Sequence, residues 1–375
     1  MILKGPYGEI LFAFLVAIMG LIGNTTIAIF FLRKRCHVNF HRLVIMLSIY
    51  DNLSIIMNLS LFIVPNLLRT SGNVHQIVEK ENYLIPFVYP VLEIALTGSI
   101  YFTLAITIER YLIVCHPFYA ISHSWPIKSY MLSISLFCLA YNIPRCLELR
   151  TLECQNGTID TSKVCENEPN SWRRSFIDSN HNCSIRNSML AFTDLGCSSN
   201  YFFIYHIGLD SIFKCILPFV LLLIMNGLIM KRGLQNCQSH DALNKRQSKI
   251  NIIKRRVHNN KNSDKNNSIK GINKEDVKLA ITSMIIVGIF ILCYSVIWIS
   301  KLCEFINRSP VDICKLKMNL IIGYFVTTLN SSIKCYVYFF IRYNPFKYLK
   351  SLYIRSVSKQ HFLHVNTLTS NGNVL

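Results

Sequence analysis

Several charged residues in this sequence lie inside or at the end of long apolar stretches. The apolar run from Thr97 to Phe118 closes with the triplet Glu109-Arg110-Tyr111. Four more charged residues interrupt other apolar runs; they are Asp51, Glu93, Lys214 and Lys334. A charge surrounded by hydrocarbon is costly unless it faces protein or water, so each of these residues is a functional-site candidate. Such groups could line an ion path, pair with one another, or change partners in a switch.

The sequence lacks the motifs of the common membrane enzymes. Neither a His-Glu-x-x-His metal motif nor a Gly-x-Ser-x-Gly nucleophile elbow is present, and the eleven histidines show no metal-ligand spacing. We therefore predict that the chain is not an enzyme and that it carries no metal and no cofactor.

The elements that position these charges are predicted to be membrane-spanning helices. The chain has 375 residues, of which 51% are hydrophobic and only 16% charged, which is typical of a polytopic membrane protein. A spanning helix needs about 20 apolar residues. Seven runs meet this requirement, at roughly 8–32, 43–68, 86–115, 127–147, 207–231, 279–303 and 316–341. The predicted fold is all-α, a bundle of seven transmembrane helices in a multi-pass protein of the lipid bilayer.

The distribution of basic residues predicts the orientation of the chain. Residues 231–278 carry thirteen Lys or Arg against four acids, whereas residues 145–210 carry six bases and eight acids. Because basic loops stay in the cytoplasm, the N-terminus is expected outside and the C-terminus inside. The net charge of +19 is spread over loops between apolar runs, which argues against nucleic acid as a partner.

Three segments outside the helices have distinct compositions. The second outer loop, about 148–206, holds two glycosylation acceptors, Asn156 and Asn182, and is expected to be oxidised. The disulfide candidates in this loop and in the last outer loop are Cys154, Cys165, Cys183, Cys197, Cys303 and Cys314. The third inner loop, about 232–278, is basic and lacks apolar periodicity, which predicts disorder. Residues 1–341 hold the predicted spans, and the tail 342–375 begins with the spacing of a short amphipathic eighth helix.

Phrases along the chain resemble those of rhodopsin-like G-protein-coupled receptors, in particular invertebrate FMRFamide-type neuropeptide receptors. They are GN at 23–24, LSIYDN around Asp51, the Glu109 triplet, YNIPRCLE at 141–148, LPFVLLLIMN with Pro218, and LNSSIKCYVYFF at 329–340. Six phrases in this order, on the right spans, make a specific pattern. The resemblance implies a plasma-membrane receptor that is activated by an extracellular neuropeptide, such as an RFamide-like peptide, and that signals to a heterotrimeric G protein, with arrestin as a further partner of the tail.

The resemblance implies that Arg110 is part of a switch. Arg110 is expected to hold Glu109 in the inactive state and to meet the G protein when the sixth helix moves outward, with Tyr111 completing the triplet. Asp276 is either a second restraint on Arg110 or a carboxylate that stabilises the start of the sixth helix. Tyr338 of the seventh helix is retained from the family pattern.

Asp51 and Lys334 are expected to form a polar core. In the family, the acid of the second helix and a residue of the seventh help to hold a sodium ion. Here that residue is Lys334, so we predict that its ammonium pairs with Asp51 and replaces the ion. Asn24 and Asn330 could complete the cluster. The alternative is that Lys334 extends toward the inner membrane surface.

The ligand site is predicted around Glu93. An amine ligand is disfavoured because Leu92 stands where amine receptors carry an Asp. Glu93 lies about 25 Å above Arg110 at helical rise. It could bind the guanidinium of an Arg-Phe-amide peptide. The residues that could pack on its phenyl ring are Tyr89, Tyr294 and Trp298. The alternative is an internal pair of Glu93 with Lys214 or Lys301.

Three departures from the family pattern bear on activation. Ile85 stands about where the family's third-helix cysteine belongs, the sixth-helix motif reads Cys293-Tyr294-Ser295-Val296 without proline, and Cys335 replaces the seventh-helix proline. They keep open an orphan or atypically activated receptor for another ligand. A transporter or channel is the remaining alternative, disfavoured because no internal repeat is found.

Overall fold

The computed structural model describes twelve stretches and isolated residues of the chain. They are 6–33, 39–65, 74–116, 118–119, 126–153, 188–233, 235, 284–286, 288–296, 299, 323 and 325–337. Several predictions fall outside them: the inner loop, the eighth helix, Lys301, Asp276, Trp298, Tyr338, the acceptors Asn156 and Asn182, and the cysteines Cys154, Cys165, Cys183, Cys303 and Cys314.

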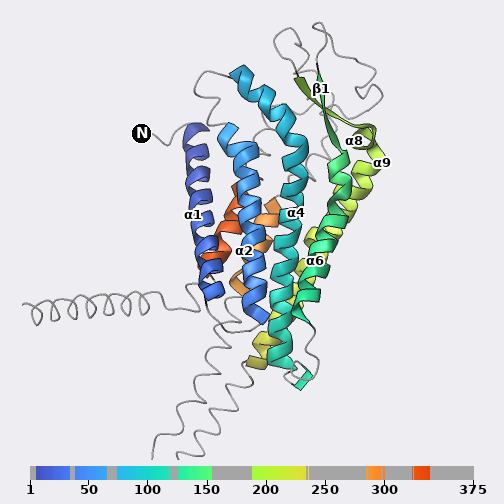
Figure 1. Ribbon diagram of the computed structural model, residues 1–375. Helices are drawn as coiled ribbons and strands as arrows, with labels where there is room; N and C mark the ends of the chain where they lie inside the picture. The colour runs from blue at the N-terminus through green and yellow to red at the C-terminus, as the bar shows by residue number, and fades with distance from the viewer. Residues whose placement is uncertain are drawn as a thin grey trace, which may run out of the picture.

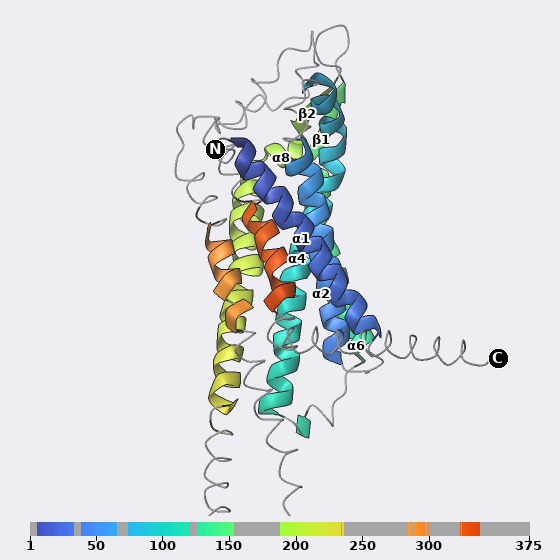
Figure 2. The ribbon, with the colours of Figure 1, turned by 90° about the vertical axis from the view of Figure 1, so that its left-hand side faces the viewer.

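The described residues form a bundle of long helices (Figure 1). The first four helices are α1 (Pro6–Arg33), α2 (Asn39–Asn58) extended by η1 (Leu59–Ile63), α4 (Val74–Cys115), and α6 (Ile127–Asn142) extended by η3 (Ile143–Leu147). In the fifth, η5 (Phe202–Leu209) and η6 (Ser211–Ile216) lead into residues 217–233, and we call it the fifth-span helix. These five helices are long and apolar enough to cross a membrane. Helical residues also occur within 284–296 and 325–337, inside the sixth and seventh predicted spans. Figure 2 shows residues 284–296 beside the fifth-span helix, whereas residues 325–337 bond to α1 and α2.

The third helix is longer than predicted. α4 starts at Val74, twelve residues before the predicted start at 86, and it contains Pro86 and Pro90 in its interior. Hydropathy identifies only the part of a helix that can lie in hydrocarbon. For α4 this part is Asn82–Cys115. With 42 residues, α4 is about 63 Å long at helical rise, twice the thickness of the hydrocarbon core. Its first turns therefore continue beyond the bundle, beside β1 in Figure 1.

The second outer loop contains a β-hairpin-like pair that the all-α prediction missed. β1 (Leu149–Glu153) pairs antiparallel with β2 (Ser188–Phe192), in the register Leu149 to Phe192. Thr151 Oγ1 donates to the carbonyl of Asn82 at 2.6 Å, which fixes the pair against α4. Two short helices follow β2, α8 (Asp194–Cys197) and α9 (Ser199–Tyr201). Each strand is only five residues long, and the two lie far apart in the chain. A search for long apolar runs therefore does not detect them.

The bundle exposes apolar side chains and buries polar ones. α1 exposes Phe12, Leu15, Met19 and Ile22, each more than half exposed. The buried polar residues of the spans include Asn24, Ser48, Asp51, Ser54, Asn58, Thr97, Ser99, Thr103, Asn142, Asn226, Asn330, Ser331 and Lys334. An apolar outer surface with polar groups inside is the arrangement expected of helices surrounded by lipid.

Glycines allow two of the helix contacts to be close. A Cβ added at Gly98 of α4 would lie 2.2 Å from Cδ1 of Tyr50 of α2. A Cβ at Gly20 of α1 would lie 2.9 Å from Cδ1 of Ile55. Small residues at such crossings let helices approach in a membrane, where packing replaces the hydrophobic effect as the driving force.

Candidate functional site

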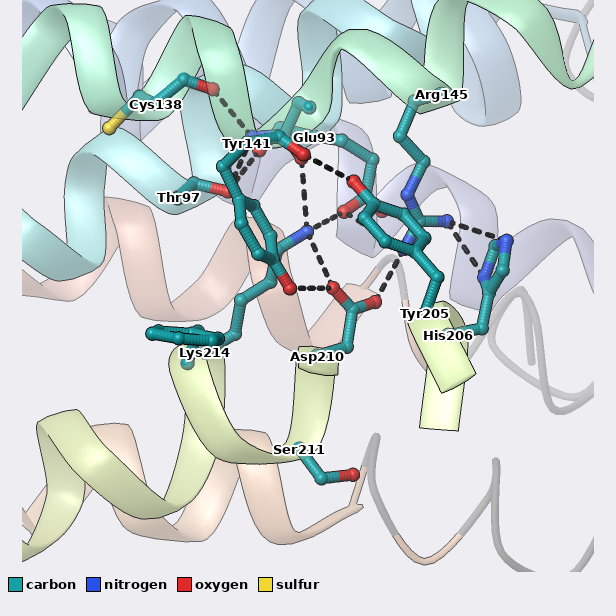
Figure 3. A network of polar contacts seen from close by, with 12 residues as sticks. Glu93, Thr97, Cys138, Tyr141, Arg145, Tyr205, His206, Asp210, Ser211 and Lys214 are labelled. Atoms are coloured by element: carbon teal, nitrogen blue, oxygen red, sulfur yellow. Dashed lines mark hydrogen bonds and ion pairs between the residues drawn. The ribbon is translucent and has the colours of Figure 1, made fainter. Parts of the chain in front are cut away.

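The most extensive polar cluster lies toward the end of the bundle that carries β1 and β2. We call it the outer cluster and define it by Tyr89, Glu93, Asn142, Arg145, Glu148, His206, Asp210 and Lys214. Helical spacing brings each group to one face: Tyr89 and Glu93 on α4 are four residues apart, and His206, Asp210 and Lys214 follow one another at the same interval. Figure 3 shows that side chains of α4, the α6–η3 helix and the η5–η6 helix converge here.

Arg145 is the central cation of the outer cluster. Its side chain is 1% exposed, and its guanidinium donates to Asp210 Oδ2 and to the hydroxyl of Tyr89. It also donates to Nδ1 of His206 at 2.9 Å. Arg145 Nε lies 3.8 Å from Glu148 Oε1. An arginine so deep in the bundle is stable because its donors reach acceptors on two other helices, α4 and the fifth-span helix.

Lys214 is the second cation, and it has several acceptors. Its Nζ donates to Glu93 Oε2 at 2.5 Å and to Asn142 Oδ1 at 3.3 Å. It also lies 3.3 Å from Asp210 Oδ1. The internal pair of Glu93 with Lys214, one of the two sequence-based alternatives, is therefore the arrangement in this structure.

His206 bridges Arg145 and Glu148 as a neutral imidazole. A guanidinium has only donors, so Nδ1 of His206 accepts, and Nε2 carries the proton and donates to Glu148 Oε1 at 2.7 Å. Tyr201 donates its hydroxyl to the same oxygen at 2.6 Å. Burial raises the pKa of the Glu148 carboxyl, but the hydrogen bond from His206 and the charge of Arg145 lower it by more, so that its pKa lies below the ordinary value.

The outer cluster carries one more negative than positive charge. Glu93, Glu148 and Asp210 face Arg145 and Lys214, and His206 is neutral. The side chain of Glu93 is 16% exposed, against 4% for Glu148 and 5% for Asp210. Glu93 is thus the most exposed carboxylate of the cluster, and the excess negative charge favours a cation near it.

A second cluster lies in the middle of the bundle. The Nζ of Lys334 is 2.8 Å from Asp51 Oδ1, and Ser99 donates to the same oxygen at 2.6 Å. Asn24 donates to the carbonyl of Ser331 at 3.1 Å. Asn330, four residues before Lys334, is also buried. Within the described residues, its Oδ1 accepts no hydrogen bond. The lysine is 4% exposed, so its ammonium lies inside the protein and not at the membrane surface.

The triplet Glu109-Arg110-Tyr111 lies at the opposite end of α4 from the outer cluster. The Arg110 guanidinium carbon lies 3.9 Å above the ring of Phe40, at the start of α2. The hydroxyl of Tyr111 is 3.1 Å from Nε2 of His116. Glu109, Arg110 and Tyr111 are all half-buried, so they are accessible at this end of the bundle.

Comparison with known proteins identifies the architecture. Residues 23–338 match the family described as the 7 transmembrane receptor (rhodopsin family). The chain belongs to this family. Its members are multi-pass plasma-membrane proteins with a bundle of seven helices, and they are signalling receptors, not enzymes. The predicted neuropeptide-receptor resemblance is confirmed at the level of family and of named relatives.

Two curated relatives are named for the same peptide. The chain is 30% identical over 224 residues to the FMRFamide receptor of Drosophila melanogaster, a match that covers 58% of this chain and 36% of the relative. It is 26% identical over 147 residues to the FMRFamide peptide receptor frpr-18 of Caenorhabditis elegans, covering 38% of this chain and 34% of the relative. The matched segment spans about a third of the length of each relative.

The structure brings three of the predicted ligand-site residues together, Tyr89, Glu93 and Lys214. Tyr294 packs against Phe290, with ring centroids 4.5 Å apart. Among the disulfide candidates, Cys197 is described and is disulfide-bonded, to a cysteine outside the described residues.

Five members of the outer cluster were not predicted as site residues. They are Asn142, Arg145, Glu148, His206 and Asp210, although two signals in the sequence were available. The phrase from Asn142 to Glu148 repeats polar residues every third position, and His206, Asp210 and Lys214 repeat every fourth. Ser99 of the mid-bundle cluster was also missed, because a serine in an apolar run is common and usually bonds its own helix.

Proposed function

We propose that this receptor is activated by an extracellular peptide ending in Arg-Phe-amide and that it signals to a heterotrimeric G protein. The names of the two relatives support the ligand class, and the negative balance of the outer cluster supports a cationic ligand. The single observation that carries the proposal is the carboxylate of Glu93, the most accessible acid of a cluster with an unbalanced negative charge.

In this proposal the guanidinium of the peptide binds Glu93. A guanidinium and a carboxylate form two parallel hydrogen bonds, and the pair is strong where water is largely excluded. The phenyl ring of the peptide packs on aromatic residues of the outer half, for which Tyr89, Tyr294 and Trp298 are the candidates. The N-terminus lies outside in this arrangement.

The test replaces Glu93 by Gln and compares two probes. Phe-Met-Arg-Phe-amide and its citrulline analogue differ in the charge of one side chain and hardly in its shape. Glu93→Gln is expected to weaken binding of the arginine peptide by roughly tenfold or more, equal to about 1.4 kcal/mol, and that of the citrulline peptide far less. Glu153→Gln, in the exposed part of β1, is the matched control. Equal losses for both peptides would contradict the role of Glu93.

The proposed output is through Arg110. On activation, the guanidinium leaves its place over Phe40 and meets the G protein at the inner end of the bundle, with Glu109, Tyr111, Asp276 and Tyr338 as the other members of the switch. Arg110→Ala is expected to reduce agonist-dependent signalling, measured as calcium and cyclic AMP, to the background of untransfected cells while surface expression is retained. Normal signalling from this variant would refute the switch. The tail 342–375 is proposed as the arrestin-binding segment.

We also propose that the ammonium of Lys334 takes the place of the sodium ion of the family. The ammonium is tethered to the seventh helix and lies 2.8 Å from Asp51, so it supplies the cation at all salt concentrations. Agonist affinity should then be independent of sodium.

A further inference from the structure

We propose that Lys214 is an internal competitor of the ligand, which occupies Glu93 in the empty receptor and is displaced by the guanidinium of an incoming peptide. This inference rests on the proposed function and deepens it, because it names the residue that sets how tightly and how selectively Glu93 binds arginine.

The contacts of Lys214 allow it to leave Glu93 at low cost. Its Nζ lies 3.3 Å from both Asp210 Oδ1 and Asn142 Oδ1, in addition to 2.5 Å from Glu93. When a guanidinium takes over the carboxylate, the ammonium keeps a charged acceptor and a neutral one. A buried ammonium with no acceptor would be strongly unfavourable, and the arrangement avoids that state.

Arg145 is the other cation within reach of Glu93, but it cannot play this role. Its Nη2 lies 4.0 Å from Glu93 Oε2, beyond hydrogen-bond distance, while its two terminal nitrogens are engaged by Asp210, Tyr89 and His206. Displacing Arg145 would break hydrogen bonds to two other helices, α4 and the fifth-span helix. It therefore holds the shape of the outer cluster, and Lys214 is the cation that exchanges.

The charge balance allows Lys214 to stay in the cluster when it leaves Glu93. The cluster has one negative charge in excess, so a bound guanidinium neutralises it while the ammonium remains on Asp210 and Asn142. The ammonium of Lys214 makes one hydrogen bond to Glu93, whereas a guanidinium can make two parallel ones. An arginine of the peptide can therefore compete with Lys214 for Glu93 better than an amine of the peptide can.

The experiment measures binding of fluorescently labelled Phe-Met-Arg-Phe-amide and its citrulline analogue to full-length receptor in cell membranes. Lys214→Met removes the competitor and is expected to tighten the arginine peptide by roughly tenfold while leaving the citrulline peptide within about twofold. Lys214→Gln, which keeps a donor for Asp210 and Asn142, should shift binding in the same direction. It serves as the test if Lys214→Met fails to reach the cell surface.

A double variant separates exchange at Glu93 from a general field effect. Glu93→Gln with Lys214→Met has the same cluster charge as the native receptor but lacks the carboxylate. If Glu93 is the contact, the double variant binds the arginine peptide as weakly as Glu93→Gln alone. Native affinity in the double variant would show that net charge alone matters and would overturn the inference.

The outcomes also separate this inference from the proposed function. A native receptor that does not bind the arginine peptide, or binds it no better than the citrulline peptide, overturns the proposed function. The competitor role alone is overturned if the native receptor prefers the arginine peptide but neither Lys214 variant, when expressed at the surface, binds that peptide more tightly.

Discussion

Each charge buried in the bundle is held by oxygen or nitrogen atoms from other helices. Arg145, Lys214 and Lys334 are less than a tenth exposed, and each reaches a carboxylate. Removing one partner of such a pair leaves the other charge unpaired in a medium that solvates it poorly, which is more costly than removing both. The pairs are therefore best tested by single and double substitutions.

The pair of Asp51 and Lys334 gives the clearest prediction at this scale. Lys334→Met leaves the Asp51 carboxylate buried and unpaired, and we expect a loss of ~3–5 kcal/mol of stability. Asp51→Asn combined with Lys334→Met should recover most of it. The midpoint of thermal unfolding of the detergent-solubilised receptor measures both effects, and Lys80→Met, at an exposed position of α4, is the control.

Sodium provides a second readout of the same pair. Agonist affinity of the native receptor should not change when sodium replaces a bulky organic cation at constant ionic strength. A several-fold sodium effect on the native receptor would contradict the proposal that Lys334 takes the place of the ion.

At the scale of elements, irregular helix geometry and small residues shape the bundle. η5 and η6 are wide turns of the π type in the fifth-span helix; η5 carries His206, η6 carries Lys214, and Asp210 lies between them. Helices with such turns are frequent at functional sites, because the extra residue per turn changes the direction in which side chains point. α2 and α4 approach closely at Gly98, which allows Ser99, the next residue, to reach Asp51.

Substitution at Gly98 tests this close contact. Gly98→Ala places a methyl group 2.2 Å from the ring of Tyr50, so the helices or the ring must move. We expect a cost of ~1–3 kcal/mol, seen as a lower midpoint of thermal unfolding and lower surface expression. Gly227→Ala is the matched control, because a Cβ there meets no atom within 4 Å. Equal behaviour of the two variants would show that the α2–α4 contact is not tight.

At the scale of the whole molecule, the positions of the clusters on α4 define a direction. β1, which directly follows Glu148 of the outer cluster, lies toward one end of the bundle in Figure 1, and Arg110 lies near the other end, in the last turns of α4. In the proposed function, an effect of the ligand at Glu93 therefore has to act over about 25 Å of helix to reach Arg110. The mid-bundle cluster of Asp51, Ser99 and Lys334 lies between them on the same helix and joins α2, α4 and the seventh segment.

The topology predicts which loops are accessible from outside the cell. An epitope tag beside Asn156 should be detected on intact cells, and a tag within residues 231–278 only after permeabilisation. The basic inner loop and the acidic outer loop set this orientation. Detection of both tags from the same side would contradict the seven-span arrangement on which the proposed function depends.

The sequence by itself determined the family, the apolar spans and the charges that need partners. Hydrocarbon allows an isolated spanning segment only one backbone structure, the helix, so apolar length alone indicates where the spans lie. The same physics requires Asp51, Glu93, Lys214 and Lys334 to find partners inside the protein. These conclusions follow from the medium and need no knowledge of how the helices are arranged.

Only the tertiary structure decided which partners these charges have. Glu93 and Lys214 are 121 residues apart, and both Lys214 and Lys301 were possible partners from the sequence. Arg145 could be read as a helix-end residue until the structure placed it among Asp210, Tyr89 and His206. The rotation and separation of neighbouring helices select the pair, and these are set by contacts between side chains that are distant in the chain and leave no local pattern.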